Sequence, residues 1–234
     1  MPTLSYKPVR LGWLILFASL LLGAGWVAAS GRLFLSPAPK TIWLIGDSLS
    51  RGLYASSEAN TYRAILEREL NAPITRIAGC NVRKALEQVA QAETWPEVVF
   101  IEVGINDLRE TPAQDQESCP WLPPEEFPAA YHQLVDTLEA HGVLVIAGTI
   151  PWSGWQPEDA IWPRIQTFNQ VIRQSTPHIA DLWTATLYAE DQLSQPDQPS
   201  AFGPGYQGDR FHPSDAGHRR IAQVFLKAYG EATR

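Results

Sequence analysis

Cysteine, methionine and charge are scarce in this sequence of 234 residues. Two cysteines and one methionine are present, and charged residues make up 18% of the chain. So few cysteines exclude a disulfide scaffold and a cysteine-rich zinc module. Apolar residues make up 45%, which is too many for a disordered chain and is not typical of a collagen or a coiled coil. The length suits one sizeable domain.

Acidic residues are absent from the first 32 positions, which hold Lys7, Arg10 and Arg32. Positions 33–234 therefore contain 15 basic and 25 acidic residues, a net formal charge of −10. A surface with this charge repels the phosphate backbone of nucleic acids. We therefore expect no nucleic-acid partner.

The segment 11–29 contains 19 residues and no charged side chain. As a helix it would extend over about 28 Å, close to the thickness of the hydrocarbon core of a bilayer. Lys7 and Arg10 precede it, which favours a cytoplasmic N-terminus. A cleaved signal peptide is the alternative, because residues 27–29 are small enough for a signal peptidase. The segment is longer than the roughly 7–15 apolar residues of a signal peptide, so we favour an uncleaved membrane anchor.

The predicted organisation has three parts. A signal-anchor or signal peptide occupies 1–32, a stiff proline-containing linker occupies 33–40, and one domain occupies 41–234. Both interpretations of the first part place the domain outside the cytoplasm, in the periplasm or the extracellular space. It is membrane-anchored if the segment is kept and secreted if the segment is cleaved.

Short apolar segments alternate with helical patterns throughout the predicted domain. The expected strands are 41–45, 74–78, 98–103, 143–147 and 178–182. Helical spacing of apolar residues is clearest in 127–138, 161–172 and 221–228. Strands that are apolar throughout and are separated by helices indicate a parallel sheet covered on both faces. The predicted fold class is therefore a three-layer α/β/α domain.

Polar residues follow three of the expected strands, at the edge where open parallel sheets form their sites. Ser48 is the last residue of Gly-Asp-Ser, which follows the first strand. Gly79 follows the second strand, and Asn106 follows the third as part of Gly-Ile-Asn-Asp. A serine at a helix start can act as a nucleophile, while a glycine N–H and an asparagine amide can donate to a developing oxyanion. Taken singly, the first two segments are more typical of a turn or a helix cap.

Asp209 and His212 stand just before the last helical pattern. Histidine titrates near neutral pH, which suits a general base. A carboxylate beside it can hold the imidazole tautomer and stabilise the imidazolium. By itself the pair fits a capped turn with a surface histidine equally well.

The four segments together resemble the motifs of the SGNH (GDSL) hydrolase family. The segments, in order, are Gly46-Asp47-Ser48, Gly79, Gly104-Ile105-Asn106-Asp107 and Asp209-x-x-His212. The resemblance covers the whole predicted domain and departs from the family pattern at no catalytic position. It implies a flavodoxin-like parallel sheet and a serine esterase that requires no metal or organic cofactor.

The resemblance also assigns roles to individual residues. Ser48 is implied to be the nucleophile, His212 the base and Asp209 the partner of His212. The implied oxyanion hole consists of the backbone N–H groups of Ser48 and Gly79 and the side-chain amide of Asn106. The expected substrate is a small-molecule or glycan ester, and export favours an acyl or acetyl ester of a cell-envelope glycan or lipid.

Three other functions share features of this sequence. An O-acyltransferase would use the same acyl-enzyme and remains an alternative. A non-catalytic glycan-binding protein of the same fold is disfavoured, because Ser48 and His212 are both present. A metallophosphoesterase is disfavoured too, because Ser50 stands where its second aspartate ligand would be.

Cysteines and tryptophans occur in loops expected on the side of the site. Cys80 and Cys119 are expected to form a disulfide in an oxidising compartment, with two unpaired thiols as the alternative. Trp121, Trp152 and Trp155 either form an acyl pocket or a sugar-stacking surface, or cover an edge of the core.

Overall fold

A computed structural model describes residues 41–111, 119–152, 155, 157–187 and 212–234. The predicted membrane segment 11–29, the linker 33–40 and Asp209 lie outside the described residues. Within the described ranges, no helix is long and apolar enough to cross a membrane.

Five parallel strands form the centre of the domain. They are β1 (Ile42–Gly46), β2 (Ile74–Ala78), β3 (Val98–Glu102), β4 (Leu144–Gly148) and β5 (Ile179–Ala180). Their order in the sheet is β2-β1-β3-β4-β5, and each pair of neighbours is parallel. The predicted α/β class with a parallel sheet is confirmed, and the order is the flavodoxin-like one. The fifth strand is shorter than its predicted range 178–182.

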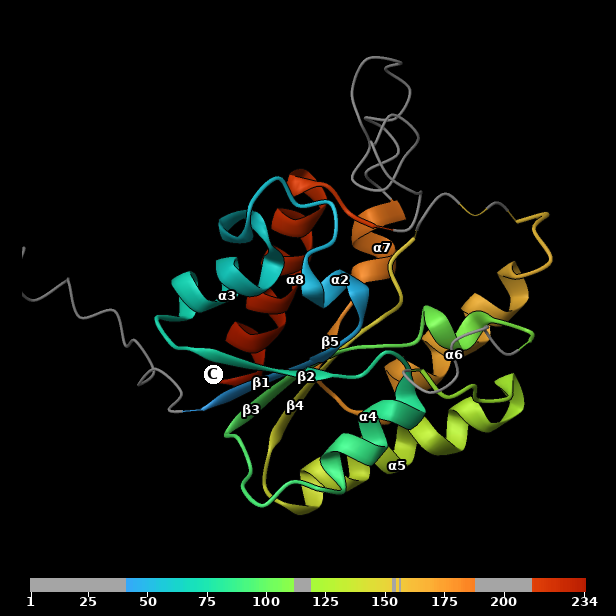
Figure 1. Ribbon diagram of the computed structural model, residues 1–234, viewed down its shortest axis with the longest axis horizontal. Helices are drawn as coiled ribbons and strands as arrows, with labels where there is room; N and C mark the ends of the chain where they lie inside the picture. Colours follow the sequence, from blue (N-terminus) through green and yellow to red (C-terminus); the bar gives the residue numbers. More distant parts are fainter. Residues whose placement is uncertain (1–40, 112–118, 153–154, 156, 188–211) are drawn as a thin grey trace, which may run out of the picture. The chain divides into compact units, whose positions relative to one another are not determined.

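Helices cover both faces of this sheet (Figure 1). One face carries α4 (Val82–Val89), α5 (Phe127–Ala140) and α6 (Trp162–Ser175). The other carries α3 (Tyr62–Leu70) and α8 (Asp215–Ala232), and α7 (Leu182–Leu187) packs beside α8. The three helical patterns expected from the sequence correspond to α5, α6 and α8.

Strand β3 shows why the sequence contains apolar segments without alternation. Val99 and Ile101 belong to the core beneath α4, α5 and α6, whereas Val98 and Phe100 belong to the core beneath α3 and α8. All four side chains are buried, because helices cover the sheet on both sides. Glu102 ends the strand with a buried carboxyl group at the edge where the loops converge.

Candidate active site

The candidate site begins at the turn between β1 and the short helix α2 (Ser48–Arg51). Asp47 caps this helix, because its Oδ1 accepts a hydrogen bond of 2.9 Å from the backbone N–H of Leu49. Gly46 permits the tight approach of chain segments here, since a Cβ on it would lie 2.6 Å from the Cβ of Ser50. The local sequence thus places Ser48 as the first residue of a helix at the carboxyl edge of the sheet.

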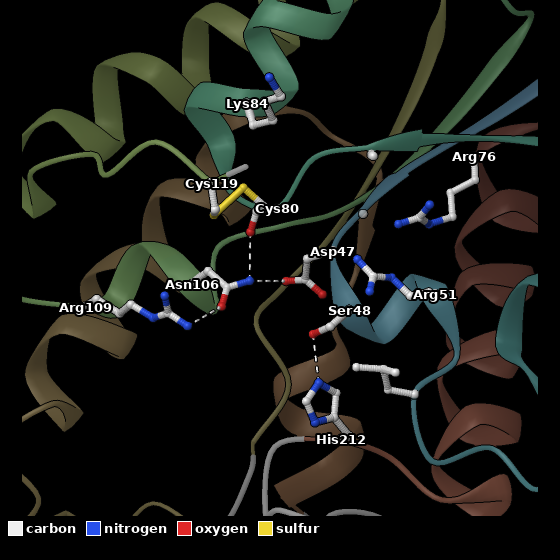
Figure 2. A pocket seen from close by; sticks show the side chains of 13 residues that line it. Asp47, Ser48, Arg51, Arg76, Cys80, Lys84, Asn106, Arg109, Cys119 and His212 are labelled. Carbon is white, nitrogen blue, oxygen red and sulfur yellow. Dashed lines mark hydrogen bonds between the residues drawn. A yellow bond between two sulfur atoms is a disulfide. The ribbon is translucent and has the colours of Figure 1, made fainter. Parts of the chain in front are cut away.

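His212 approaches this serine from the other end of the chain. Its Nε2 lies 2.8 Å from Ser48 Oγ, within hydrogen-bond distance (Figure 2). The chain then enters α8, where Ser214 caps the helix by accepting a hydrogen bond of 2.9 Å from Gly217 N. The structure therefore brings together the predicted nucleophile and the predicted base. Asp209, the predicted partner of His212, lies outside the described residues.

Asn106 lies beside Ser48 at the carboxyl end of β3 (Figure 2). Its Nδ2 donates a hydrogen bond of 2.7 Å to the carbonyl oxygen of Cys80 and lies 3.4 Å from Asp47 Oδ2. The first contact fixes the orientation of the amide, and the second is long for a hydrogen bond. The predicted amide donor is thus placed at the site, with one N–H held by a backbone carbonyl.

Gly79 lies directly after β2. Its backbone N–H donates a hydrogen bond of 3.1 Å to the carbonyl oxygen of Gly46, which extends the β1–β2 ladder by one residue. Its role as an oxyanion donor stays a prediction. Packing explains the glycine: a Cβ would lie 3.0 Å from Ala85 Cβ and 3.2 Å from Ile45 Cγ2.

Two buried carboxyl groups lie beneath the nucleophile. Burial raises the pKa of Asp47 to about 7, although the charges of Arg76 and Arg51 act in the opposite direction. Burial and the Asp47 charge raise the pKa of Glu102 well above its usual range, and Tyr62 donates a hydrogen bond of 3.2 Å to Glu102 Oε2. A carboxyl group kept neutral by its surroundings adds no repulsion to an oxyanion that forms nearby.

Asp107 connects two loops of the site. Both of its carboxylate oxygens accept from the backbone N–H of Val82, at 3.3 and 3.2 Å, at the start of α4. Burial raises the pKa of Asp107 to about 7, despite this hydrogen bond. The residue after Asn106 thereby holds the β3 loop against the helix that follows β2.

A disulfide joins Cys80 to Cys119, 39 residues apart in sequence (Figure 2). Cys80 lies in the loop after β2, and Cys119 lies between the β3 loop and α5. Both cysteines line the cavity in front of Ser48. The predicted alternative of two unpaired thiols does not apply to this structure.

Two cavities meet at the nucleophile. One, of about 430 Å³, is lined by the disulfide and by basic side chains, and we call it the cationic cavity. The other, of about 390 Å³, is lined by Ile105, Leu108, Trp155 and Ile161, and we call it the apolar cavity. Ser48, Asn106, Arg109 and His212 line both. The described residues contain no group of three His, Cys, Asp or Glu side chains that could hold a metal ion.

The three loop tryptophans, Trp121, Trp152 and Trp155, occupy different positions in the structure. Trp155 lines the apolar cavity, as an acyl pocket requires. Trp152 is buried in the core, where its Nε1 donates to the carbonyl oxygen of Trp155 at 2.8 Å. Trp121 Nε1 lies 3.4 Å from the carbonyl oxygen of Arg109. Of the three, Trp155 is the one that lines a cavity containing Ser48.

Sequence reasoning missed the basic side chains of the cationic cavity. Arg51 stands three residues after Ser48, and Arg76 interrupts the otherwise apolar end of β2. β2 is an edge strand in which only Ile74 is buried, so an arginine there was a weak signal. Lys84 and Arg109 lie in segments that gave no such signal.

Comparisons with known proteins agree with this arrangement. The model of the GDSL-like Lipase/Acylhydrolase family matches residues 44–220, which is more than half of the chain. None of the curated proteins matches the sequence.

Solved structures share the fold. The acetyl xylan esterase AlAXEase is 18% identical, with a TM-score of 0.62 over 80% of this chain and 98% of its own. LAE5, an α/β hydrolase enzyme from the metagenome of Lake Arreo, is 24% identical, with a TM-score of 0.60 over 82% of this chain and 95% of its own. Axe2, an acetylxylan esterase from Geobacillus stearothermophilus, is 23% identical, with a TM-score of 0.59 over 82% of this chain and 94% of its own. At these identities the likeness concerns the fold.

Proposed function

The chain belongs to the GDSL-like lipase/acylhydrolase family, and from this premise we propose that it is an exported serine ester hydrolase acting through Ser48 and His212. Membership of the family makes it a carboxylic ester hydrolase. The observation that carries the assignment of the two residues is the 2.8 Å contact between Ser48 Oγ and His212 Nε2. Asp209 is the proposed partner of His212.

The proposed reaction proceeds through an acyl-enzyme. Ser48 Oγ attacks the ester carbonyl carbon while His212 Nε2 takes its proton, and the carbonyl oxygen becomes an oxyanion. The tetrahedral intermediate collapses when His212 returns this proton to the leaving alcohol. Water then attacks the acyl-enzyme with His212 as base, and the acid and the free Ser48 hydroxyl are released.

The oxyanion is proposed to be stabilised by the backbone N–H of Ser48 and the amide of Asn106. One N–H of the Asn106 amide has only a long contact, 3.4 Å from Nδ2 to Asp47 Oδ2, which it would lose on binding the oxyanion. The raised pKa of Asp47, about 7, supports this role, because a carboxyl group that is neutral part of the time competes less for the amide and repels the oxyanion less.

The proposed substrate is an acyl or acetyl ester of a cell-envelope glycan or lipid. Two observations support it: structural neighbours include acetyl xylan esterases, and the segment 11–29 has the length and composition of a membrane anchor. The proposed location is outside the cytoplasm, with the domain anchored to the membrane, or secreted if the segment is cleaved. The O-acyltransferase and the non-catalytic glycan-binding protein remain alternative outcomes of the test.

The test measures hydrolysis of p-nitrophenyl acetate by the full-length protein in mild detergent. Ser48→Ala is expected to abolish turnover, and excess chelator is expected to leave it unchanged. Ser175→Ala, at the end of α6 remote from the cavity-lining residues, is the matched control and is expected to keep turnover. Chelator-sensitive activity that survives in Ser48→Ala would contradict the serine mechanism. Activity that appears only with a glycan acceptor would favour the transferase.

A further inference from the structure

Basic side chains gather in front of Ser48 in a domain that is otherwise acidic. The cationic cavity is lined by Arg51, Arg76, Lys84 and Arg109, which come from α2, β2, α4 and the loop after β3 (Figure 2). Positions 33–234 carry a net formal charge of −10. The local charge of the four basic side chains around this cavity is therefore opposite in sign to the net charge of the domain. A concave site lined by one sign of charge attracts ligands of the opposite sign.

Arg76 is held in a fixed position inside this cavity. Its Nε donates a hydrogen bond of 3.1 Å to Ser50 Oγ, and Ser50 Oγ donates one of 2.8 Å to the carbonyl oxygen of Asp47. This chain ties the guanidinium to the turn that carries the nucleophile. The Nη groups of Arg76 have no hydrogen-bond partner among the described residues.

Arg51 is the last residue of α2, the short helix that begins with Ser48. Figure 2 shows the Arg51 guanidinium between the Asp47 carboxyl group and the Arg76 guanidinium. Burial and the nearby charge of Arg51 lower the pKa of Arg76, as expected for two cations close to each other. The repulsion between them is relieved by any anion that binds both.

Neither arginine has a carboxylate within ion-pair distance among the described residues. Five other described arginines do have one, and they are Arg63, Arg68, Arg83, Arg164 and Arg173. Arg109, which also lines the cavity, has none within the described ranges either. Lys84 pairs with Glu87 at 3.0 Å. The charges of Arg76 and Arg51 act on the buried carboxyl group of Asp47, but neither arginine forms an ion pair with it.

The two cavities differ in the half of an ester that each would hold. The apolar cavity suits an acyl group, because its wall is formed by Ile105, Leu108, Trp155 and Ile161. With the carbonyl carbon at Ser48, the alcohol half then extends into the cationic cavity. An arginine guanidinium forms paired hydrogen bonds with the two oxygens of a carboxylate or with a phosphate.

We infer that Arg51 and Arg76 bind an anionic group, a carboxylate or a phosphate, carried by the alcohol half of the ester. The preferred substrate is therefore an anionic ester, such as an acylated acidic sugar or an acylated sugar phosphate, rather than a neutral one. This inference rests on the proposed function, since it takes Ser48 as the reacting group.

The experiment compares four acetyl or succinyl esters with the full-length protein. 3-Acetoxybenzoate and 3-acetoxyphenyl phosphate carry the anion on the alcohol half, the methyl ester of 3-acetoxybenzoate is neutral, and phenyl hemisuccinate carries the anion on the acyl half. Each kcat/KM is divided by the hydroxide-catalysed rate constant of the same ester, which removes differences in leaving-group reactivity. The carboxylate and phosphate arms distinguish the two kinds of oxyanion.

We expect the alcohol-side anion to raise normalised kcat/KM by about tenfold to a hundredfold over the neutral ester, because a hydrogen-bonded ion pair contributes about 1.5–3 kcal/mol. In the Arg51→Gln, Arg76→Gln double variant this ratio is expected to fall to about one, mainly through KM. Arg83→Gln, whose side chain pairs with Glu126 outside the cavity, is the matched control and is expected to keep the ratio.

Three outcomes would overturn the inference: a ratio near one in the wild type, a ratio that survives in the double variant, or a preference for phenyl hemisuccinate. Binding gives a readout that does not need turnover. 3-Hydroxybenzoate is expected to bind Ser48→Ala more tightly than its methyl ester does, and equal affinities measured by calorimetry would also overturn the inference. Ester hydrolysis that persists in Ser48→Ala would instead contradict the proposed function and leave the binding result standing.

Discussion

Ser48 Oγ and His212 Nε2 lie 2.8 Å apart, although 164 residues separate them in the sequence. The serine is presented by a turn that Gly46 and Asp47 shape, and the histidine is presented by the segment that enters α8. Their contact joins the turn after β1 to the segment before α8 at the carboxyl edge of the sheet. Both side chains line the two cavities, so the contact lies where the cavities meet.

Replacement of the histidine tests this contact directly. His212→Gln is expected to lower kcat for p-nitrophenyl acetate by about 10²–10⁴-fold, because the general base is lost while the cavities remain. The half-buried position suggests little change in stability, which thermal unfolding of the same preparation checks. A variant that keeps wild-type kcat would contradict the assignment of His212 as base.

Asn106→Ala tests the side-chain donor of the proposed oxyanion hole. Loss of one such donor costs about 10²–10³-fold in kcat, and KM is expected to change much less. The variant also removes the hydrogen bond that Asn106 donates to the carbonyl oxygen of Cys80, so we expect a stability loss of about 1 kcal/mol.

Asn81→Ala provides the matched control for that variant. Asn81 caps α4 by accepting a hydrogen bond of 2.9 Å from Lys84 N, and its loss is expected to cost about 1 kcal/mol of stability. Its kcat should remain close to that of the wild type. If the two asparagine variants lose stability equally and keep equal turnover, Asn106 has a structural role only.

The Cys80–Cys119 disulfide is expected to contribute to the stability of the site loops. Removal of both cysteines in a Cys80→Ala, Cys119→Ala variant should lower the free energy of unfolding by about 3–4 kcal/mol in the chain-entropy model for a separation of 39 residues. Denaturant unfolding with and without reductant measures the effect. Thiol titration of the unreduced native protein should find no reactive thiol, and two equivalents would contradict the bond.

His218 should make stability depend on pH. It is fully buried in α8 and accepts a hydrogen bond of 3.3 Å from Tyr62 N, and burial lowers its pKa from 6.5 to about 4. Between these two pKa values the unfolded chain binds a proton that the folded chain does not. The free energy of unfolding therefore falls as pH drops from about 6.5 to about 4, by an amount on the order of 3 kcal/mol.

The pH effect is measured as the difference in unfolding free energy between the wild type and His218→Gln. Asp215 and His212 lie near enough to influence the pKa of His218, and both are unchanged in this comparison. The wild type should lose its advantage over the variant as pH falls through the window. A difference that stays constant from pH 7.5 to 4.5 would contradict the buried neutral histidine.

Much of the fold followed from local sequence patterns. Strand β3 was predictable because its residues are apolar on both sides, which only a covered parallel sheet accommodates. The site residues Ser48 and Asn106 were predictable because each directly follows such a strand, and parallel strands bring their carboxyl ends to one edge. The family resemblance of the motifs added their roles.

Hydrogen bonding between distant segments was not predictable in the same way. The bond between the Gly79 N–H and the carbonyl oxygen of Gly46 depends on the register between β1 and β2. The Tyr62–Glu102 contact likewise joins a helix to a strand 40 residues away. A sequence pattern reports what a segment buries, and it carries no information about which atom of another segment lies opposite.

By itself the sequence determined the layered α/β domain and its strands, because these follow from periodicity within each segment. It also predicted a nucleophile and a base, because the motifs that resemble the family are each confined to a few neighbouring residues. The tertiary structure alone decided that Arg51 and Arg76 line one cavity, that Asp47 and Glu102 are both buried, and that the N–H of Gly79 bonds to Gly46. Each of these depends on charges and hydrogen-bonding atoms from separate segments meeting at distances that only the folded chain establishes.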